Sequence, residues 1–147
     1  MLRGIDPLLS PELLQAMAAM GHGDELAIVD ANFPAASCAR RLLRIDGADA
    51  PAVLAAVLSL LPLDSFVPEP VAVMAVVGDP AAEPPAVRDF RAVLARLAGK
   101  PVAVKVLPRE EFYERARRAF AIVATGERRF YGNILLAKGV IGPDEGG

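Results

Sequence analysis

Short apolar runs alternate with helical patterns along the whole chain, and this alternation limits the folds that are open to it. Runs such as Glu25–Val29 and Val71–Val77 are apolar but too short for buried helices. Segments with N-cap residues and helical spacing of apolar residues lie between most of them. We therefore expect an α/β fold, a single-domain layered sandwich with helices packed on a mixed or largely parallel sheet.

The expected elements follow from capping residues and apolar spacing. Ser10 and Pro11 read as N-cap and first residue of a helix that ends at Gly21. Further helices are expected over 49–61, 86–98 and 109–119, and strands over 25–29, 41–45, 71–77, 102–107, 120–124 and 133–137. We expect one domain over residues 1–141 and a flexible tail over 142–147.

The composition points to self-association. Hydrophobic residues make up 54% of the chain, above the roughly 45–50% usual for soluble domains. The surplus indicates apolar surface buried between subunits. With 16 basic and 18 acidic residues, the chain lacks the basic face of a nucleic-acid-binding protein. Its apolar runs are shorter than the ~20 residues of a membrane span.

The single cysteine and the start of the chain favour a reducing compartment. Cys38 has no second cysteine with which to form an internal disulfide, and it reads as a small apolar filler. We see no basic leader followed by an apolar run, so no signal peptide is expected. A cytoplasmic location is the prediction. The chain has one His and one Cys, which argues against a transition-metal site.

Polar side chains gather around the first strand. His22, the only histidine, lies between two glycines at the expected end of a helix, where the dipole favours the imidazolium by ~0.3–1 kcal/mol. Asp30 and Asn32 follow the strand, at the end where ligands bind in open α/β sheets. These residues could form one site, although a helix cap, a strand and a turn would explain the same letters.

Charges near the later helices are less specific. Arg109 begins a helix, where a cation opposes the dipole, and this indicates either a function or a solvated surface residue. Arg128 and Arg129 read as a solvated turn. A phosphate site at Gly21-x-Gly23 is disfavoured, because this pair follows a helix and does not begin one.

Several motifs distributed from the N-terminus to about Val140 form a recognisable set. They are Met20-Gly21-His22-Gly23-Asp24-Glu25, Asp30-Ala31-Asn32-Phe33-Pro34, Leu63-Asp64-Ser65, Phe112-Tyr113-Glu114-Arg115-Ala116 and Tyr131-Gly132-Asn133-Ile134. The first and last of these are specific when found together. The set resembles the sugar-mutarotase family that comprises L-fucose mutarotase and D-ribose pyranase.

The resemblance implies an isomerase that interconverts the α and β anomers of a monosaccharide without metal or organic cofactor. It implies that His22 is the proton donor and that Asp30, Arg109, Tyr131, Gly132 and Asn133 bind the sugar. Tyr131 could act as a second acid or base, or only as a hydrogen-bonding group.

The nature of two residues favours one branch of the family. The ribose branch typically has histidine and alanine where this chain has Arg109 and Gly132, so L-fucose is the expected sugar. The resemblance also implies a homo-oligomer, such as a ring-shaped decamer, with sites completed across subunits. The alternatives are a mutarotase for another monosaccharide such as D-ribose, and a non-catalytic sugar-binding oligomer.

Overall fold

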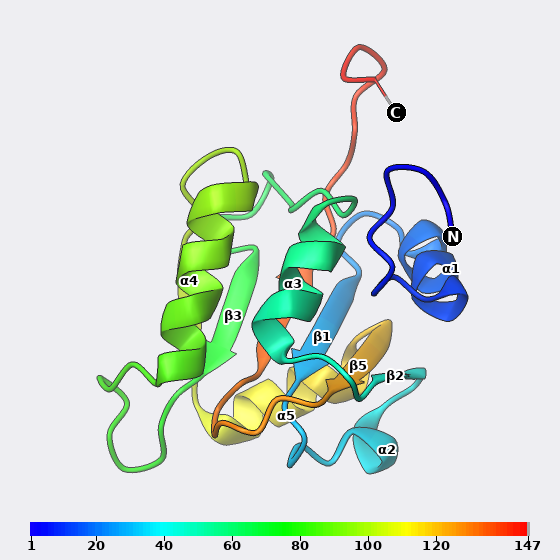
Figure 1. The fold of residues 1–147 in the computed structure, drawn as a ribbon. Coiled ribbons are helices and arrows are strands. Elements are labelled where there is room, and N and C mark those ends of the chain that lie inside the picture. Colours follow the sequence, from blue (N-terminus) through cyan, green and yellow to red (C-terminus); the bar gives the residue numbers. More distant parts are fainter. Residues whose placement is uncertain (147) are drawn as a thin grey trace.

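Helices and strands alternate in the computed structural model, which describes residues 1–146 (Figure 1). The elements are α1 (Pro11–Ala19), β1 (Glu25–Val29), α2 (Ala35–Cys38), β2 (Leu42–Ile45), α3 (Ala50–Leu58), β3 (Val71–Met74), α4 (Pro85–Leu97), β4 (Val104–Leu107), α5 (Arg109–Arg118), β5 (Ala121–Thr125) and β6 (Ile134–Ala137). The α/β prediction is confirmed.

The strands form one six-stranded sheet in the order β2-β5-β1-β6-β3-β4. Neighbours are parallel except where β6 pairs antiparallel with β1 and β3. The sheet is therefore mixed, as predicted. Because β6 runs the other way, its first residue lies at the same edge of the sheet as the last residues of β1 and β3. The functional site depends on this reversal.

Side-chain alternation along the buried strands supplies both faces of the sheet. In β1, Leu26 and Ile28 join the core under α1, α3 and α4, whereas Ala27 and Val29 join the core under α2 and α5. Figure 1 shows α3 and α4 side by side over the first face. Each buried aliphatic side chain contributes about 1.5–3 kcal/mol, so a strand buried on both faces is apolar throughout.

Local capping starts α1 and α3 as expected, but α1 ends differently. Ser10 Oγ accepts from Leu13 N–H at 3.2 Å. Gly21 follows the C-cap residue Met20, as predicted, but Met20 leaves the helix in an extended conformation and Gly21 has no positive φ. Lys138 Nζ instead donates to the carbonyls of Met17 and Met20 at 2.7 and 2.6 Å. The end of α1 is thus capped by Lys138, which directly follows β6 and lies 118 residues from Met20.

Two further differences concern the edge of the sheet. The strand predicted over 71–77 ends at Met74, because β6 pairs with β3 only as far as Val73. Residues 75–77 therefore leave the sheet, and Val77 is 61% exposed. The short helix α2 was not predicted, since four residues carry too weak a pattern. Both segments border the candidate site.

No helix among residues 1–146 is long and apolar enough to cross a membrane. Cys38 is a free thiol, half-buried against the core under α2 and α5, as expected for an apolar filler. The flexible tail over 142–147 stays a prediction, and Gly147 lies outside the described residues.

Candidate active site

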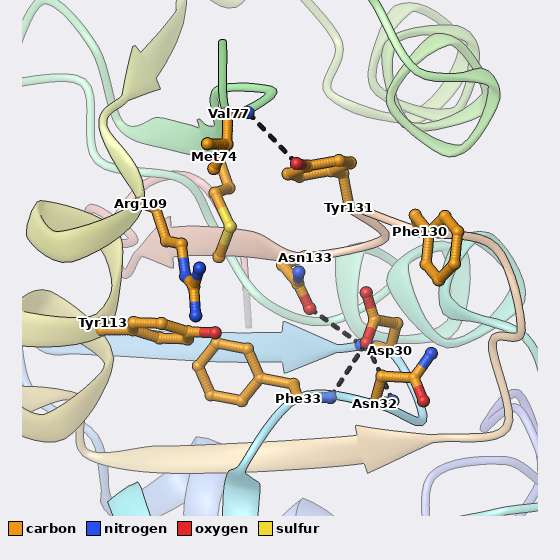
Figure 2. A pocket seen from close by; sticks show the side chains of 10 residues that line it. All are labelled: Asp30, Asn32, Phe33, Met74, Val77, Arg109, Tyr113, Phe130, Tyr131 and Asn133. Atoms are coloured by element: carbon orange, nitrogen blue, oxygen red, sulfur yellow. Dashed lines mark hydrogen bonds between the residues drawn. The ribbon is translucent and has the colours of Figure 1, made fainter.

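A cavity of about 340 Å³ opens at the edge of the sheet where β1 and β3 end and β6 begins (Figure 2). This volume lies within the roughly 300–1,000 Å³ typical of small-molecule sites. The location agrees with the rule that ligands bind beyond the carboxyl ends of strands. The cavity is lined by Asp30, Asn32, Phe33, Met74, Val77, Arg109, Tyr113, Phe130, Tyr131 and Asn133.

Asp30 joins the two loops that form the floor of the cavity. Its Oδ1 accepts from the backbone N–H groups of Asn32 and Phe33, both at 3.0 Å. Its Oδ2 accepts from Gly132 N–H at 3.1 Å. Burial raises the pKa of Asp30, and the three N–H donors partly offset that rise. The carboxylate therefore fixes the loop after β1 against the loop before β6.

The segment Tyr131–Asn133 has an unusual backbone. Tyr131 has φ of 60°, a left-handed conformation that is uncommon outside glycine. Its hydroxyl accepts from Val77 N–H at 3.1 Å, which leaves the phenolic proton available for a ligand. Tyr131 therefore links the loop after β3 to the segment before β6, with its ring over the cavity (Figure 2).

Asn133 and Arg109 offer donors to the cavity. Asn133 Oδ1 accepts from Asp30 N–H at 2.9 Å, which directs the amide nitrogen the other way. Asn133 also lines the cavity, so its amide nitrogen can donate to a ligand there. Arg109 begins α5, and its guanidinium lies 5.3 Å from the Tyr113 ring centre. No ion pair holds Arg109 within the described part of the chain.

The rest of the lining is largely apolar, and sequence reasoning did not assign it to the site. Met74 and Val77 bound one side, while Phe33 and Tyr113 meet at 5.1 Å between ring centres on another. Met74 and Val77 both lie in the apolar run Val71–Val77, which was interpreted as a buried strand. An apolar residue that closes a cavity has the same sequence signal as one that fills a core, so only the fold could separate them.

An ion-pair network around the buried Glu127 lies next to Gly132 and corrects one interpretation. Arg129 was assigned to a solvated turn, but its guanidinium binds both Glu127, at 2.9 Å, and Asp89, at 2.7 Å. Burial alone would raise the pKa of Glu127, but the hydrogen bonds from Arg129 outweigh burial and lower it. A Cβ placed on Gly132 would lie 2.7 Å from Glu127 Cγ. Glycine at this position is therefore a packing requirement.

His22 lies at the opposite edge of the sheet. It precedes β1 and Asp30 follows β1, a strand of five residues that spans about 17 Å at roughly 3.3 Å per residue. Within one chain, His22 and Asp30 therefore lie at opposite ends of β1 and do not meet. His22 Nε2 instead lies 3.0 Å from Asp64 Oδ1, and its ring packs 5.3 Å from Phe66. Asp64 belongs to the motif Leu63-Asp64-Ser65, one of those that carry the family resemblance, but the sequence analysis gave it no role.

The fold thus assembles five of the six predicted site residues. Asp30, Arg109, Tyr131 and Asn133 line one cavity. Gly132 is hydrogen-bonded to Asp30 at its floor, and His22 does not reach it. Among residues 1–146, no three His, Cys, Asp or Glu side chains are grouped so that they could hold a metal ion. The cavity offers an anchored carboxylate, a phenol, an amide and a guanidinium beside apolar walls, a combination suited to a small polyhydroxylated ligand.

In sequence and in fold, the chain is similar to proteins of one known family. The model of the RbsD / FucU transport protein family matches residues 3–141. The chain is 49% identical to human "Fucose mutarotase" over 146 residues, which cover 95% of this chain and 94% of the human one. Its structure resembles the fucose mutarotase from Streptococcus pneumoniae solved in complex with L-fucose, with a TM-score of 0.89, 42% identity and coverage of 96% and 100%.

A more distant structure shares the fold alone. Bacillus subtilis RbsD, solved in complex with D-ribose, aligns with a TM-score of 0.71 at 23% identity and covers 91% of this chain and 95% of that one. The family match covers the residues at both ends of the strands, that is, the cavity at one end and the His22–Asp64 pair at the other. On its sequence and on its fold, the chain belongs to the RbsD / FucU family.

Proposed function

We propose that this protein is an L-fucose mutarotase, an isomerase that interconverts the α and β anomers of L-fucose. The observation that carries the proposal is the cavity in which Asp30 anchors the Tyr131–Asn133 segment opposite Arg109. Human "Fucose mutarotase", at 49% identity, supports the activity. The L-fucose complex of the structural relative from S. pneumoniae supports the sugar.

Mutarotation needs little more than proton transfer. The ring oxygen gains a proton, the bond between C1 and the ring oxygen breaks, and the anomeric hydroxyl loses its proton. The open aldehyde rotates and the ring closes on its other face. Because the reaction already runs slowly in water, general acid–base assistance of about 10²–10⁴-fold is a useful gain.

The cavity residues have separate tasks in this proposal. Arg109 is permanently charged and donates hydrogen bonds to sugar oxygens without transferring protons. The Asn133 amide does the same from the floor of the cavity. The Tyr131 hydroxyl has already accepted from Val77 N–H, so its remaining role is to donate to the sugar. Asp30 positions the Tyr131–Asn133 segment through the backbone N–H bonds to its two oxygens. Its Oδ2 has a single N–H donor, so it can also accept from a sugar hydroxyl.

The acid that protonates the ring oxygen is His22, supplied by a second copy of the chain. Within one chain the histidine and the cavity lie at opposite edges of the sheet, so a site that contains both needs two copies. Phe66, which packs against His22, is 72% exposed. An exposed aromatic ring beside an exposed histidine fits a subunit contact at this edge.

Gly132 supports the fucose branch over the ribose branch on physical grounds. Alanine, typical of the ribose branch, would place its Cβ 2.7 Å from Glu127 Cγ and 3.4 Å from Asp30 Cβ. The loop of this chain is therefore built around glycine. We further propose that the protein is a homo-oligomer and acts in the cytoplasm, as the apolar surplus and the single cysteine suggest.

Saturation-transfer NMR of anomer exchange tests the proposal directly, with L-fucose, D-ribose, L-rhamnose and D-galactose compared at equal protein concentration. We expect L-fucose to exchange fastest. Faster exchange of D-ribose would assign the protein to the alternative sugar. Binding of L-fucose without faster exchange would replace the enzyme by a non-catalytic sugar-binding oligomer.

A further inference from the structure

Arg109 presents a charged group to the cavity without a carboxylate to hold it there. The residue is exposed at the first position of α5, and it takes part in no ion pair among residues 1–146. An arginine side chain has many rotamers, so an unrestrained one would lose that freedom each time it bound a sugar. Another contact is needed to keep the guanidinium at the cavity.

That contact is the aromatic ring of Tyr113, one turn further along α5. The Arg109 Cζ atom lies 5.3 Å from the centre of this ring, within the ~6 Å range of a cation–π interaction. Residues four apart lie on the same face of a helix, and side chains in a helix lean toward its N-terminus. The Tyr113 ring therefore extends back toward the turn that carries Arg109.

The Tyr113 ring is itself held by other aromatic rings. Phe33 lies 5.1 Å from Tyr113 and 6.0 Å from Phe112, measured between ring centres. Phe112 is fully buried, and Phe33 N–H donates to Asp30 Oδ1 at 3.0 Å. Figure 2 shows Arg109, Tyr113 and Phe33 along one side of the cavity. These contacts connect the anchored loop after β1 to the guanidinium on α5.

We propose that Tyr113 is a positioning residue that holds the Arg109 guanidinium at the cavity and thereby raises the affinity for the sugar. The proposal rests on the proposed function, in which Arg109 donates hydrogen bonds to sugar oxygens. Because arginine is always charged, the ring attracts it in the free and in the sugar-bound protein. The guanidinium is therefore in place before the sugar arrives.

A second arginine lies over the same ring and allows a comparison within the chain. Arg117 comes four residues after Tyr113, and its Cζ atom is 6.0 Å from the ring centre. Of the two arginines, Arg109 alone lines the cavity. The contact with Tyr113 should therefore matter for the sugar through Arg109 and not through Arg117.

The first test uses the wild-type protein without sugar. Protons above the face of an aromatic ring resonate upfield, so the side-chain protons of Arg109 should be shifted upfield and should show nuclear Overhauser contacts to the Tyr113 ring. The Arg109 signals are assigned by their loss in Arg109→Met. Unshifted Arg109 signals without these Overhauser contacts would overturn the proposal.

The second test is a double-mutant cycle in L-fucose binding, measured by titration calorimetry. Tyr113→Met replaces the ring by a flexible apolar side chain that fills irregular space. It should weaken binding about three- to tenfold, the scale of one cation–π contact. In an Arg109→Met background the same substitution should have almost no further effect, because Tyr113 acts through Arg109. Equal losses in both backgrounds, or no loss in either, would contradict the positioning role.

Tyr113→Phe and Arg117→Met are the matched controls. Tyr113→Phe keeps the ring, so it should recover most of the affinity that Tyr113→Met loses. Arg117→Met removes the other guanidinium over the same ring and should leave L-fucose binding unchanged. If it weakened binding as much as Tyr113→Met, the effect would be one of general charge on α5, and the proposal would fail. Wild-type protein that did not bind L-fucose would contradict the proposed function, whereas the Overhauser contacts would still decide the role of Tyr113.

Discussion

The carboxylate of Asp30 accepts a hydrogen bond from the backbone N–H of Gly132 at 3.1 Å, across 102 residues of sequence. The bond joins the loop after β1 to the segment before β6, and those two strands are antiparallel neighbours. The floor of the cavity therefore exists only when both strands are paired. Stability and sugar binding are coupled at this one contact.

Asp30→Asn should weaken both properties. The amide can present an oxygen to Asn32 and Phe33 or to Gly132, but not to both sides, so one N–H is left facing an NH₂ group. A buried donor without an acceptor costs about 1–3 kcal/mol, and we expect the thermal midpoint and L-fucose exchange to fall together. Asp49→Asn is the control, because asparagine also caps helices. Unchanged exchange in a folded Asp30→Asn protein would contradict the positioning role.

Gly132→Ala should be more damaging than its size suggests. The added Cβ meets Glu127 Cγ at 2.7 Å, and overpacking of this kind costs about 1–3 kcal/mol. We expect weaker L-fucose binding, measured by calorimetry, and a lower unfolding midpoint. Gly47→Ala is the matched control, since nothing lies within 4 Å of the position of its Cβ. Equal behaviour of the two variants would remove the packing argument for the fucose branch.

Tyr131→Phe and Arg109→His should separate proton handling from sugar selection. If the Tyr131 hydroxyl transfers a proton, its loss should lower the exchange rate about 10²-fold. If it only donates a hydrogen bond to the sugar, its loss should lower the binding affinity alone, by about 0.5–1.5 kcal/mol. Arg109→His should weaken L-fucose use and keep the shape of the pH profile. Exchange rates and sugar dissociation constants for both variants decide between these roles. An unchanged rate in Tyr131→Phe would leave tyrosine outside the mechanism.

Mixing two inactive variants tests whether the site is shared. His22→Ala keeps the cavity and Asp30→Asn keeps the histidine, so neither should exchange L-fucose well alone. In mixed oligomers about a quarter of the sites should combine an intact cavity with an intact histidine from a neighbour. Recovery of that fraction after co-refolding is the expected result. No recovery despite mixed assembly, or a light-scattering mass of 15.5 kDa, would contradict a site built by two copies.

The stability of the fold should depend on Glu127 at acid pH. Its pKa is lowered in the folded state, so its contribution is present above the ordinary glutamate pKa and is lost as pH falls through the lowered value. Glu127→Gln should therefore be less stable than the wild type at pH 7 and converge with it at strongly acid pH. Glu114→Gln, at an exposed pair with Arg118, should follow the wild type throughout. Thermal unfolding midpoints across this range provide the measurement.

Much of the fold was predictable because it depends on local chemistry. Ser10 and Asp49 cap the helices they were expected to cap, and the apolar run at 25–29 is the strand β1. The site was predictable in part, since the polar residues after β1 stood out in an apolar sequence, whereas those before β6 came only from the family resemblance. The motifs identified the family on their own, and the match of the family model over residues 3–141 confirms it.

Tertiary structure decided which of these residues meet. Strand direction separates His22 from Asp30, although only seven residues lie between them, because β1 carries the chain to the other edge of the sheet. The reversal of β6 brings Tyr131, Gly132 and Asn133 to Asp30 from a hundred residues away. The pairing of His22 with Asp64 depends in the same way on where the loop after α3 returns to the sheet. The local sequence shows which residues could act at a site. Which of them come close together depends on strand pairing, and no local pattern encodes that.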